Sequence, residues 1–325
     1  MKYLTIPALI LLAILALAAV FLYKDDLPKE LVDASYSSEA SQFMDLGDLG
    51  RVHFRDQGKR QGQTLLLLHG SNASLHTFEP WVALLREDYR LVSLDLPGHG
   101  LTGETPKADY STDGFVQVVD ELATRLNLDG FVLVGSSMGG GVALGYALAH
   151  PDKTQGLVLI GSGGLAVEEG VEAEDDTPHE PPIAFQLLAQ PWFQAIAVKL
   201  DFRYLMGQGV RSAYNDSPMV NDELIRRYYE LNLRSGTRAA TIKRFQLGLP
   251  TRPEAEIASI QAPTLLVWGE EDALVPFAAA LRFKELLPQA ETAFYKDVGH
   301  MPMEEIPEKS AADLRQFLQA IAPAE

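Results

Sequence analysis

The sequence has no cysteine among its 325 residues. That absence excludes disulfide bonds, thiolate metal sites, a cysteine nucleophile and a lipid-modified N-terminal cysteine. Basic residues are also few, because 27 Lys and Arg stand against 44 Asp and Glu, and the formal net charge is -17. A protein with this charge repels phosphate backbones, so we expect no nucleic-acid partner and no charge-driven binding to anionic lipid.

The residues that are present favour one hydrophobic core with an insertion. The chain is long for one domain and short for two large ones. Hydrophobic residues make up 47% of the sequence, which is enough to bury a sizeable core. The sequence contains no internal repeat and no low-complexity domain.

Residues 3–23 form an uncharged run of 21 residues that is rich in Leu, Ala and Ile. As a helix, this run would be about 31 Å long, which matches the hydrocarbon core of a bilayer. We therefore predict a transmembrane anchor or signal segment over residues 1–23. The acidic exit at Asp25-Asp26 favours a membrane-anchored, extracytoplasmic body, periplasmic in a Gram-negative bacterium. The alternative is secretion after cleavage, because Ala16-Leu17-Ala18 resembles a signal-peptide site.

Buried strands and helical stretches alternate over most of the remaining chain. A polar tether is predicted over residues 24–41 and a short hairpin over 43–55. The predicted later strands are residues 65–68, 91–94, 131–134, 157–160, 264–268 and 292–295. Strands that alternate with helices indicate an α/β protein with a parallel sheet covered on both faces.

The pattern changes between the fourth and fifth of these later strands. Residues 162–261 contain helix signals at 183–205, 222–233 and 237–247 and no strand signal. We therefore predict a helical cap over residues 162–261, inserted into a core formed by residues 42–161 and 262–325.

One turn carries the strongest chemical signal. Gly135-x-Ser137-x-Gly139 joins the strand at 131–134 to a helix that ends before Pro151. A strained turn of this kind aims the central hydroxyl away from the sheet, and its neighbours must lack a bulky Cβ. The alternative is an ordinary strand–helix turn, because Gly and Ser are common in turns.

Four motifs follow one another in a familiar order. They are His69-Gly70, the Asp95-x-Pro-Gly-His-Gly100 turn, the Ser137 elbow, and Asp272 followed by Gly299-His300. Together they resemble an α/β-hydrolase-fold serine hydrolase of the lipase/esterase type, from about residue 43 to the C-terminus. The resemblance implies a mostly parallel eight-stranded sheet flanked by helices, with an inserted helical cap.

The resemblance also implies a Ser-His-Asp triad with Ser137 as the nucleophile. Seven histidines compete for the role of base. We choose His300, because it alone follows the last strand in a Gly-His loop near the elbow. We expect His53 to be an exposed strand residue and His69 to brace its own loop.

The acid of the triad is predicted to be Asp272. It follows a strand with the Gly-x-x-Asp spacing of the family's acid position, where it would orient the imidazole. Glu270 and Glu271 are rivals by proximity, and Asp297 is a rival because it lies close to His300 in sequence.

The expected oxyanion hole consists of two main-chain N–H groups. Met138 follows the nucleophile and supplies one of them, and Ser71 supplies the other, with Asn72 as the second choice. Asn72 and His76 are also candidates for substrate binding, as are Trp192 and Phe193 of the cap, although cap residues can equally serve packing. The loop is not His-Gly-Gly-Gly, so bulky tertiary-alcohol esters are not expected.

These observations predict an esterase or lipase that acts on a small-molecule ester or lipid through an acyl-enzyme. No metal and no organic cofactor is expected, and the predicted N-terminal helix makes the membrane a partner. The nearest alternative keeps the triad and cleaves an amide, a lactone or a carbon–carbon bond of a dienoate. The alternative from another class is a non-catalytic, membrane-tethered binding protein.

Overall fold

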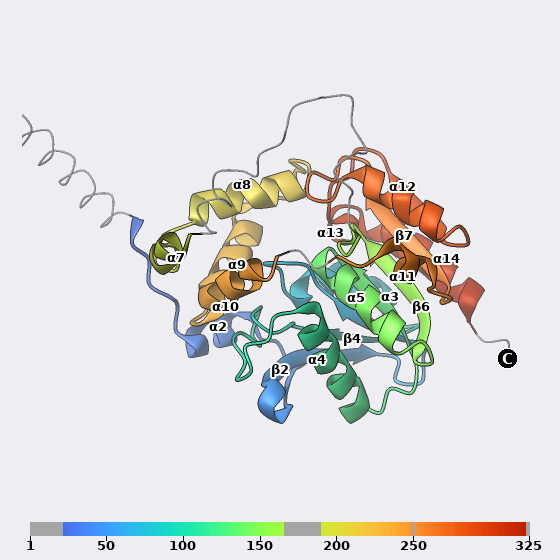
Figure 1. Ribbon diagram of the computed structural model, residues 1–325, viewed down its shortest axis with the longest axis horizontal. Coiled ribbons are helices and arrows are strands. Elements are labelled where there is room, and N and C mark those ends of the chain that lie inside the picture. Colours follow the sequence, from blue (N-terminus) through green and yellow to red (C-terminus); the bar gives the residue numbers. More distant parts are fainter. Residues whose placement is uncertain (1–21, 166–189, 249–250, 323–325) are drawn as a thin grey trace, which may run out of the picture.

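One eight-stranded sheet runs through the protein (Figure 1). The computed structural model describes residues 22–165, 190–248 and 251–322. In spatial order the strands are β1 (Ser41–Asp45), β2 (Arg51–Gly58), β4 (Arg90–Leu94), β3 (Thr64–Leu68), β5 (Phe131–Ser136), β6 (Thr154–Ile160), β7 (Thr264–Gly269) and β8 (Glu291–Tyr295). β1 with β2 and β2 with β4 pair antiparallel, and the other neighbours pair parallel. The predicted α/β class and mostly parallel sheet are confirmed.

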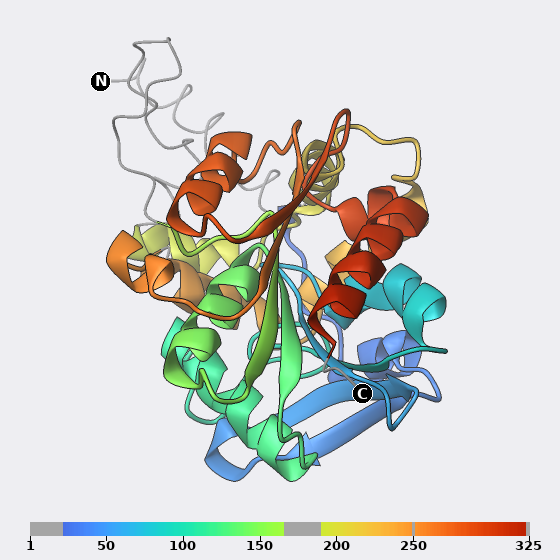
Figure 2. The ribbon, with the colours of Figure 1, turned by 90° about the vertical axis from the view of Figure 1, so that its right-hand side faces the viewer.

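Helices cover both faces of the sheet (Figure 2). One face carries α4 (Thr112–Arg125), α5 (Met138–Ala149) and α12 (Phe277–Leu286), and the other carries α3 (Glu79–Leu85) and α14 (Pro307–Ile321). Successive strand residues point to opposite faces, so Leu66 and Leu68 pack under the first layer while Leu65 and Leu67 pack under the second. This double burial explains why β3 is apolar at consecutive positions.

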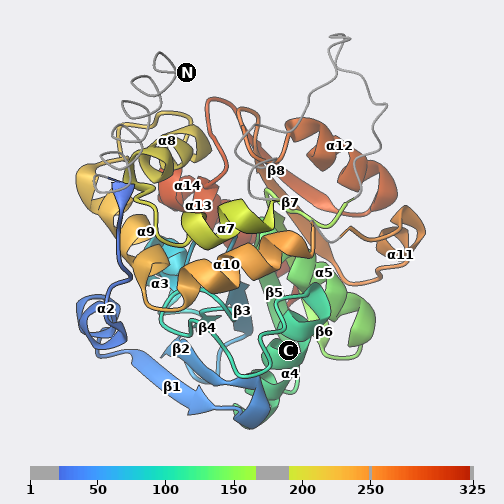
Figure 3. The same cartoon turned by 60° about the vertical axis from the view of Figure 1, so that its left-hand side comes forward.

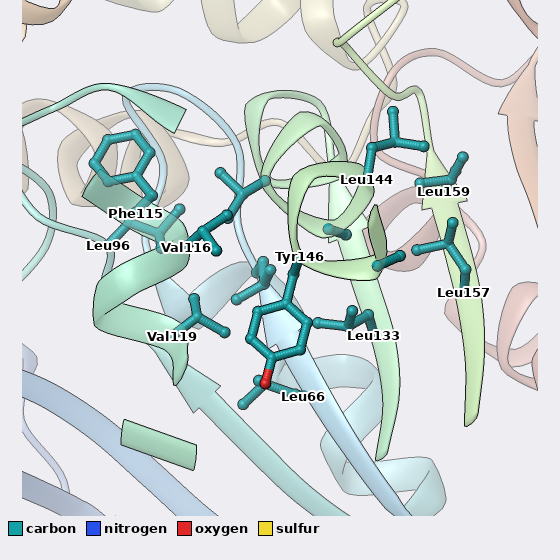
Figure 4. Packing of buried hydrophobic residues seen from close by; sticks show 14 of the residues in the cluster. Leu66, Leu96, Phe115, Val116, Val119, Leu133, Leu144, Tyr146, Leu157 and Leu159 are labelled. Atoms are coloured by element: carbon teal, nitrogen blue, oxygen red, sulfur yellow. The ribbon is translucent and has the colours of Figure 1, made fainter. Parts of the chain in front are cut away.

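The packing beneath α4 and α5 is dense (Figure 4). Tyr146 of α5 is fully buried among Leu66, Val119 and Leu133, and its hydroxyl donates a 2.9 Å hydrogen bond to Asp120 Oδ1. The ring therefore contributes apolar burial while its polar end is satisfied. Short helices complete the core, namely η1 (Gly47–Leu49), η2 (Leu75–Phe78) and α13 (Pro302–Glu305).

Helices also fill the described part of the insertion between β6 and β7. They are α7 (Pro191–Ala197), α8 (Arg203–Ala213), α9 (Asp222–Leu233), α10 (Thr237–Gln246) and α11 (Glu254–Ala258). α7 and α10 lie side by side (Figure 3), joined by a 2.7 Å hydrogen bond from Gln246 to Gln194. The helix expected over 183–205 is interrupted within its described part: α7 ends at Ala197, α8 begins at Arg203, and Leu200 between them forms a β-bridge with Tyr23. Residues 183–189 lie outside the described residues.

The segment expected to be a tether is packed against the cap instead. It contains α2 (Lys29–Tyr36), which the sequence did not reveal. Asp33 forms an ion pair with Arg234 at 2.7 Å, and Asp26 forms one with Arg238 at 2.6 Å. Two acids of this polar segment therefore bind cap arginines, while many of its other residues are exposed.

The predicted localisation also requires correction. No helix within residues 22–165, 190–248 and 251–322 is long and apolar enough to cross a bilayer. The longest described helix, α14, has 15 residues, about 22 Å against a core of about 30 Å. The prediction of a membrane-anchored, extracytoplasmic body, with the membrane as partner, is therefore not retained. Residues 1–21, on which it chiefly depended, lie outside the described part of the chain.

Leu133 tests how tightly this core is packed. We expect Leu133→Ala to lower the free energy of unfolding by about 2–5 kcal/mol, because the fully buried side chain leaves a cavity behind α5. Leu281→Ala on α12 is the matched control, since Leu281 is 49% exposed and should change stability by no more than about 0.5 kcal/mol. Urea denaturation measures both. Equal effects of the two substitutions would contradict the described packing.

Candidate active site

Ser137 lies at the sharp turn between β5 and α5. Its backbone has φ 54° and ψ -119°, a region that costs a non-glycine residue about 1–3 kcal/mol. Surrounding main-chain hydrogen bonds hold this conformation. Ser137 N donates to Ile160 O at 2.9 Å, and Ser137 O accepts from the N–H groups of Gly140 and Gly163, each at 2.9 Å.

Both glycines of the elbow motif are required by close backbone approach. A Cβ on Gly139 would lie 2.2 Å from Leu68 O, and one on Gly135 would lie 2.3 Å from Gly139 O. No side chain fits at either distance. The Gly-x-Ser-x-Gly spacing therefore corresponds to close backbone contact between the start of α5 and strands β3 and β5.

His300 and Asp272 form a buried pair near this turn. His300 Nδ1 lies 2.6 Å from Asp272 Oδ2, and the other carboxylate oxygen accepts from the N–H groups of Leu274 and Val275 at 2.8 Å each. These three hydrogen bonds fix the carboxylate, and the carboxylate in turn orients the ring. The rival acids Glu270, Glu271 and Asp297 are exposed, which favours Asp272.

One loop joins the His300–Asp272 pair to Ser137. Gly161 follows β6, and a Cβ added to it would lie 2.7 Å from His300 Nδ1, while Gly163 N donates to Ser137 O. His300 Nε2 is buried and bonds no group in the described part of the chain, Ser137 included. Contacts between base and nucleophile are often loose without substrate. The free nitrogen is thus available as a proton acceptor.

The loop after β3 flanks the other side of Ser137. A Cβ on Gly70 would lie 3.0 Å from Ser137 Cβ and 3.6 Å from Ser137 Oγ. The N–H groups of Ser71 and Met138 find no acceptor among the described residues. The carbonyl of the next residue, Asn72, ties this loop to the cap, because Asn72 O accepts a 2.9 Å hydrogen bond from Asn232 Nδ2 of α9.

Asp95 organises the loops behind the site. Its carboxylate accepts hydrogen bonds from Leu75 N and Leu101 N, each at 2.8 Å, and pairs with His53 Nδ1 at 2.7 Å. Burial by itself raises the pKa of Asp95, but the His53 hydrogen bond and the neighbouring histidines hold it well below its usual value. His53 is fully buried. The expectation that His53 is exposed was wrong. Its ring pairs with the carboxylate of Asp95, which follows β4 and is distant from His53 in the sequence.

The structure separates His76 from the contacts of the predicted cap residues Trp192 and Phe193. His76 is buried and its ring nitrogens contact Ser74 Oγ, Tyr36 O and Arg55, so the ring faces α2 and β2. We therefore drop His76 as a substrate residue. Trp192 on α7 is 61% exposed and packs edge-on against Phe193, with ring centroids 5.7 Å apart.

Two charged residues near the site escaped the sequence reasoning. Glu305 accepts hydrogen bonds from Gly299 N at 3.0 Å and Met301 N at 2.9 Å, so it brackets His300. Burial raises its pKa. Arg244 of α10 donates to Ser71 Oγ at 2.5 Å. Neither residue belongs to a motif, and only their contacts identify them.

Comparison with known proteins decides the family. The family model described as alpha/beta hydrolase fold matches residues 63–307, well over half of the chain. The chain belongs to the α/β hydrolase family. It is a hydrolase, and the resemblance inferred from the four motifs is confirmed at this level.

Proteins similar to this hydrolase include a dienoic acid hydrolase and a serine hydrolase. A 2-hydroxy-6-oxo-6-(2'-aminophenyl)hexa-2,4-dienoic acid hydrolase from Metapseudomonas resinovorans is 29% identical, over 89% of this chain and 94% of the relative. A serine hydrolase involved in carbazole degradation has a TM-score of 0.71 and 27% identity, over 86% of this chain and 98% of its own. A membrane phospholipase A, a bacterial virulence factor, has a TM-score of 0.70 over 100% of both chains; at 24% identity it shows the fold alone.

Gly161 provides a test of the geometry around His300. We expect Gly161→Ala to reduce hydrolysis of 4-nitrophenyl acetate by about 100-fold, because the new methyl group displaces the ring and the carboxylate. Gly209→Ala on α8 is the matched control, since a Cβ there meets no atom within 4 Å. Wild-type rates in Gly161→Ala would contradict the described positions of His300 and Asp272.

Asp95 provides a pH-dependent test of the loops behind the site. Because its pKa is lowered on folding, its contribution to stability is present above the ordinary carboxyl pKa and is lost as the pH falls through the folded value. Asp95→Asn should lower the free energy of unfolding by about 3 kcal/mol at pH 7. The difference from wild type should shrink below about pH 4. The exposed Asp48→Asn is the control, and a difference that grows in acid would refute this role.

Proposed function

We propose that this hydrolase cleaves carboxylic esters through an acyl-enzyme formed on Ser137. The observation that carries the proposal is the 161–163 loop, which contacts the strained Ser137 at one end and the His300–Asp272 pair at the other. A hydroxyl is barely acidic and needs a base within reach. The proposed base is the Nε2 of His300, which is buried and has no partner among the described residues.

In the first step, Ser137 Oγ attacks the ester carbonyl carbon while His300 Nε2 accepts the hydroxyl proton. Asp272 accepts the Nδ1–H hydrogen bond and stabilises the imidazolium that forms. The negative oxygen of the tetrahedral intermediate accepts hydrogen bonds from Met138 N and Ser71 N. Each such donor contributes roughly 3 kcal/mol in the transition state.

In the second step, the carbon–oxygen bond breaks and His300 gives its proton to the departing alcohol. Water then attacks the acyl group, again losing a proton to His300, and the acid leaves as Ser137 regains its hydrogen. Trp192 and Phe193 on α7 are proposed to contact the acyl chain, and Asn72 is proposed to contact the substrate beside the oxyanion. This role for the aromatic pair fits the exposure of Trp192.

Hydrolysis of a carbon–carbon bond is the second candidate function. The dienoic acid hydrolase from Metapseudomonas resinovorans favours it, because its similarity extends over nearly the whole of both chains. The attack by Ser137 would be the same, but the leaving group would be a carbon that must be protonated as the bond breaks. The cap, rather than the triad, would select between the two bonds.

Ser137→Ala tests the nucleophile directly. We expect this variant to hydrolyse 4-nitrophenyl esters at least about ten-thousand-fold more slowly than wild type, because no other group can form the acyl-enzyme. Ser259→Ala is the matched control, because Ser259 is exposed at the end of α11. A Ser137→Ala variant with wild-type rates would refute the mechanism.

A substrate panel separates the candidate bonds. The wild-type enzyme is assayed with 4-nitrophenyl esters, with amides and lactones of matched acyl chain length, and with 2-hydroxy-6-oxo-6-(2'-aminophenyl)hexa-2,4-dienoic acid. We expect the highest kcat/KM with an ester. Faster loss of the dienoate absorbance than of any ester would replace the first candidate with the second.

A further inference from the structure

The cap places one buried cation beside the nucleophile without an acid to neutralise it. Arg244 lies near the end of α10 and is 6% exposed. Other buried arginines have carboxylate partners: Arg55 with Glu79, Arg234 with Asp33 and Arg238 with Asp26. Within residues 22–165, 190–248 and 251–322, no Asp or Glu pairs with Arg244. The Phe245 ring, whose centroid lies 4.4 Å from Arg244 Cζ, offsets part of the cost of burying this charge. It supplies no anionic oxygen to pair with the guanidinium.

The guanidinium of Arg244 contacts the loop that flanks Ser137. Its Nη2 donates to Ser71 Oγ, whereas its Nε is buried and has no partner in the described part of the chain. Ser71 directly follows Gly70, whose α-carbon faces the Ser137 side chain. The positive charge therefore lies one residue along the loop from the point of contact with the nucleophile.

The surroundings hold Arg244 in this place and leave it charged. α10 packs on the turn after β4, where a Cβ on Gly98 would lie 3.1 Å from Ala240 Cβ, one helical turn before Arg244. Burial lowers the pKa of Arg244 to about 10, so the side chain remains a cation at neutral pH. His69 and His99 lie close by. Burial is the main cause that lowers the pKa of each ring, and the Arg244 charge lowers both pKa values further.

We propose that Arg244 binds an anionic oxygen group, a carboxylate or a phosphate, on the substrate whose carbonyl Ser137 attacks. This inference rests on the proposed ester hydrolysis and specifies its substrate class: acyl compounds that carry an anionic group near the scissile bond. The planar fork of a guanidinium matches such groups. The main-chain N–H of Ser71 stays available for the oxyanion, because Arg244 bonds Ser71 through the side-chain hydroxyl.

Two isosteric esters test the proposal. In 4-nitrophenyl hemiglutarate a carboxylate ends the acyl chain, and in 4-nitrophenyl 5-methylhexanoate an isopropyl group of the same shape replaces it. We expect Arg244→Gln to lower kcat/KM for the hemiglutarate by about 10- to 100-fold and to leave the neutral ester unchanged. Arg244→Lys should retain part of the preference, because it keeps the charge and loses the fork.

Two further variants serve as controls. Arg282→Gln removes an exposed cation on α12 and should affect neither ester. Ser71→Ala keeps the main-chain N–H and should keep the preference for the anionic ester. An equal fall on both esters in Arg244→Gln, reproduced by Ser71→Ala, would mean that Arg244 only positions the loop and would overturn the proposal.

Inhibition and binding complete the test. Glutarate and inorganic phosphate are compared, at constant ionic strength, as inhibitors of neutral-ester hydrolysis, and the stronger inhibitor identifies the anionic group. A wild-type enzyme that hydrolyses no ester would refute the proposed function but not the anion site. Calorimetry on Ser137→Ala measures anion binding to that site without any hydrolysis. We expect the stronger of the two anions to bind Ser137→Ala and not Ser137→Ala/Arg244→Gln. Equal binding to both proteins, or to neither, would overturn the role of Arg244.

Discussion

The backbone strain at Ser137 is the constraint on which the rest of the structure depends. A residue with φ 54° persists only where its surroundings over-determine it. Here the parallel strands β3, β5 and β6 converge, and the loops after β3 and β6 contact Ser137 from both sides. The core therefore does more than stabilise the fold, because it forces the hydroxyl of the half-buried Ser137 into a fixed position.

The charged groups around this hydroxyl are three hydrogen-bonded acids and one buried cation, Arg244, which bonds Ser71 and lies over the Phe245 ring. Asp272, Asp95 and Glu305 each accept hydrogen bonds from main-chain N–H groups, so their charges serve to fix loops. Arg244 has no such carboxylate partner among the described residues. The net charge of -17 repels anions at long range, but salt screens that repulsion beyond about 8 Å. Selection between substrates is therefore a local matter.

The sequence predicted those features whose cause is local. Apolar runs predicted the positions of the strands. The glycines of the elbow motif predicted a close backbone contact, and the structure has this contact between Gly139 and Leu68. The choice of Asp272 over its neighbours followed from spacing, and the structure pairs it with His300.

Features that arise from long-range contact could not be read in advance. His53 is an ordinary strand residue until Asp95 lies beside it, and residues 24–36 are an ordinary polar stretch until Arg234 and Arg238 pair with them. Arg244 is one of several cap arginines in the sequence. Only the fold shows that, among the described residues, no acid pairs with it. Patterns in the chain report periodicity and turns, whereas pairing between distant side chains requires coordinates.

The central claim is that His300, oriented by Asp272, activates Ser137, and covalent labelling tests it most directly. The enzyme is treated with a fluorophosphonate, and the labelled serine and the labelling rate are determined by mass spectrometry in wild type and in His300→Gln. The account predicts modification of Ser137 in wild type and labelling slowed by about 1,000-fold or more in the variant. Labelling of another serine, such as Ser41 beside His53, or an unchanged rate in His300→Gln, would contradict it.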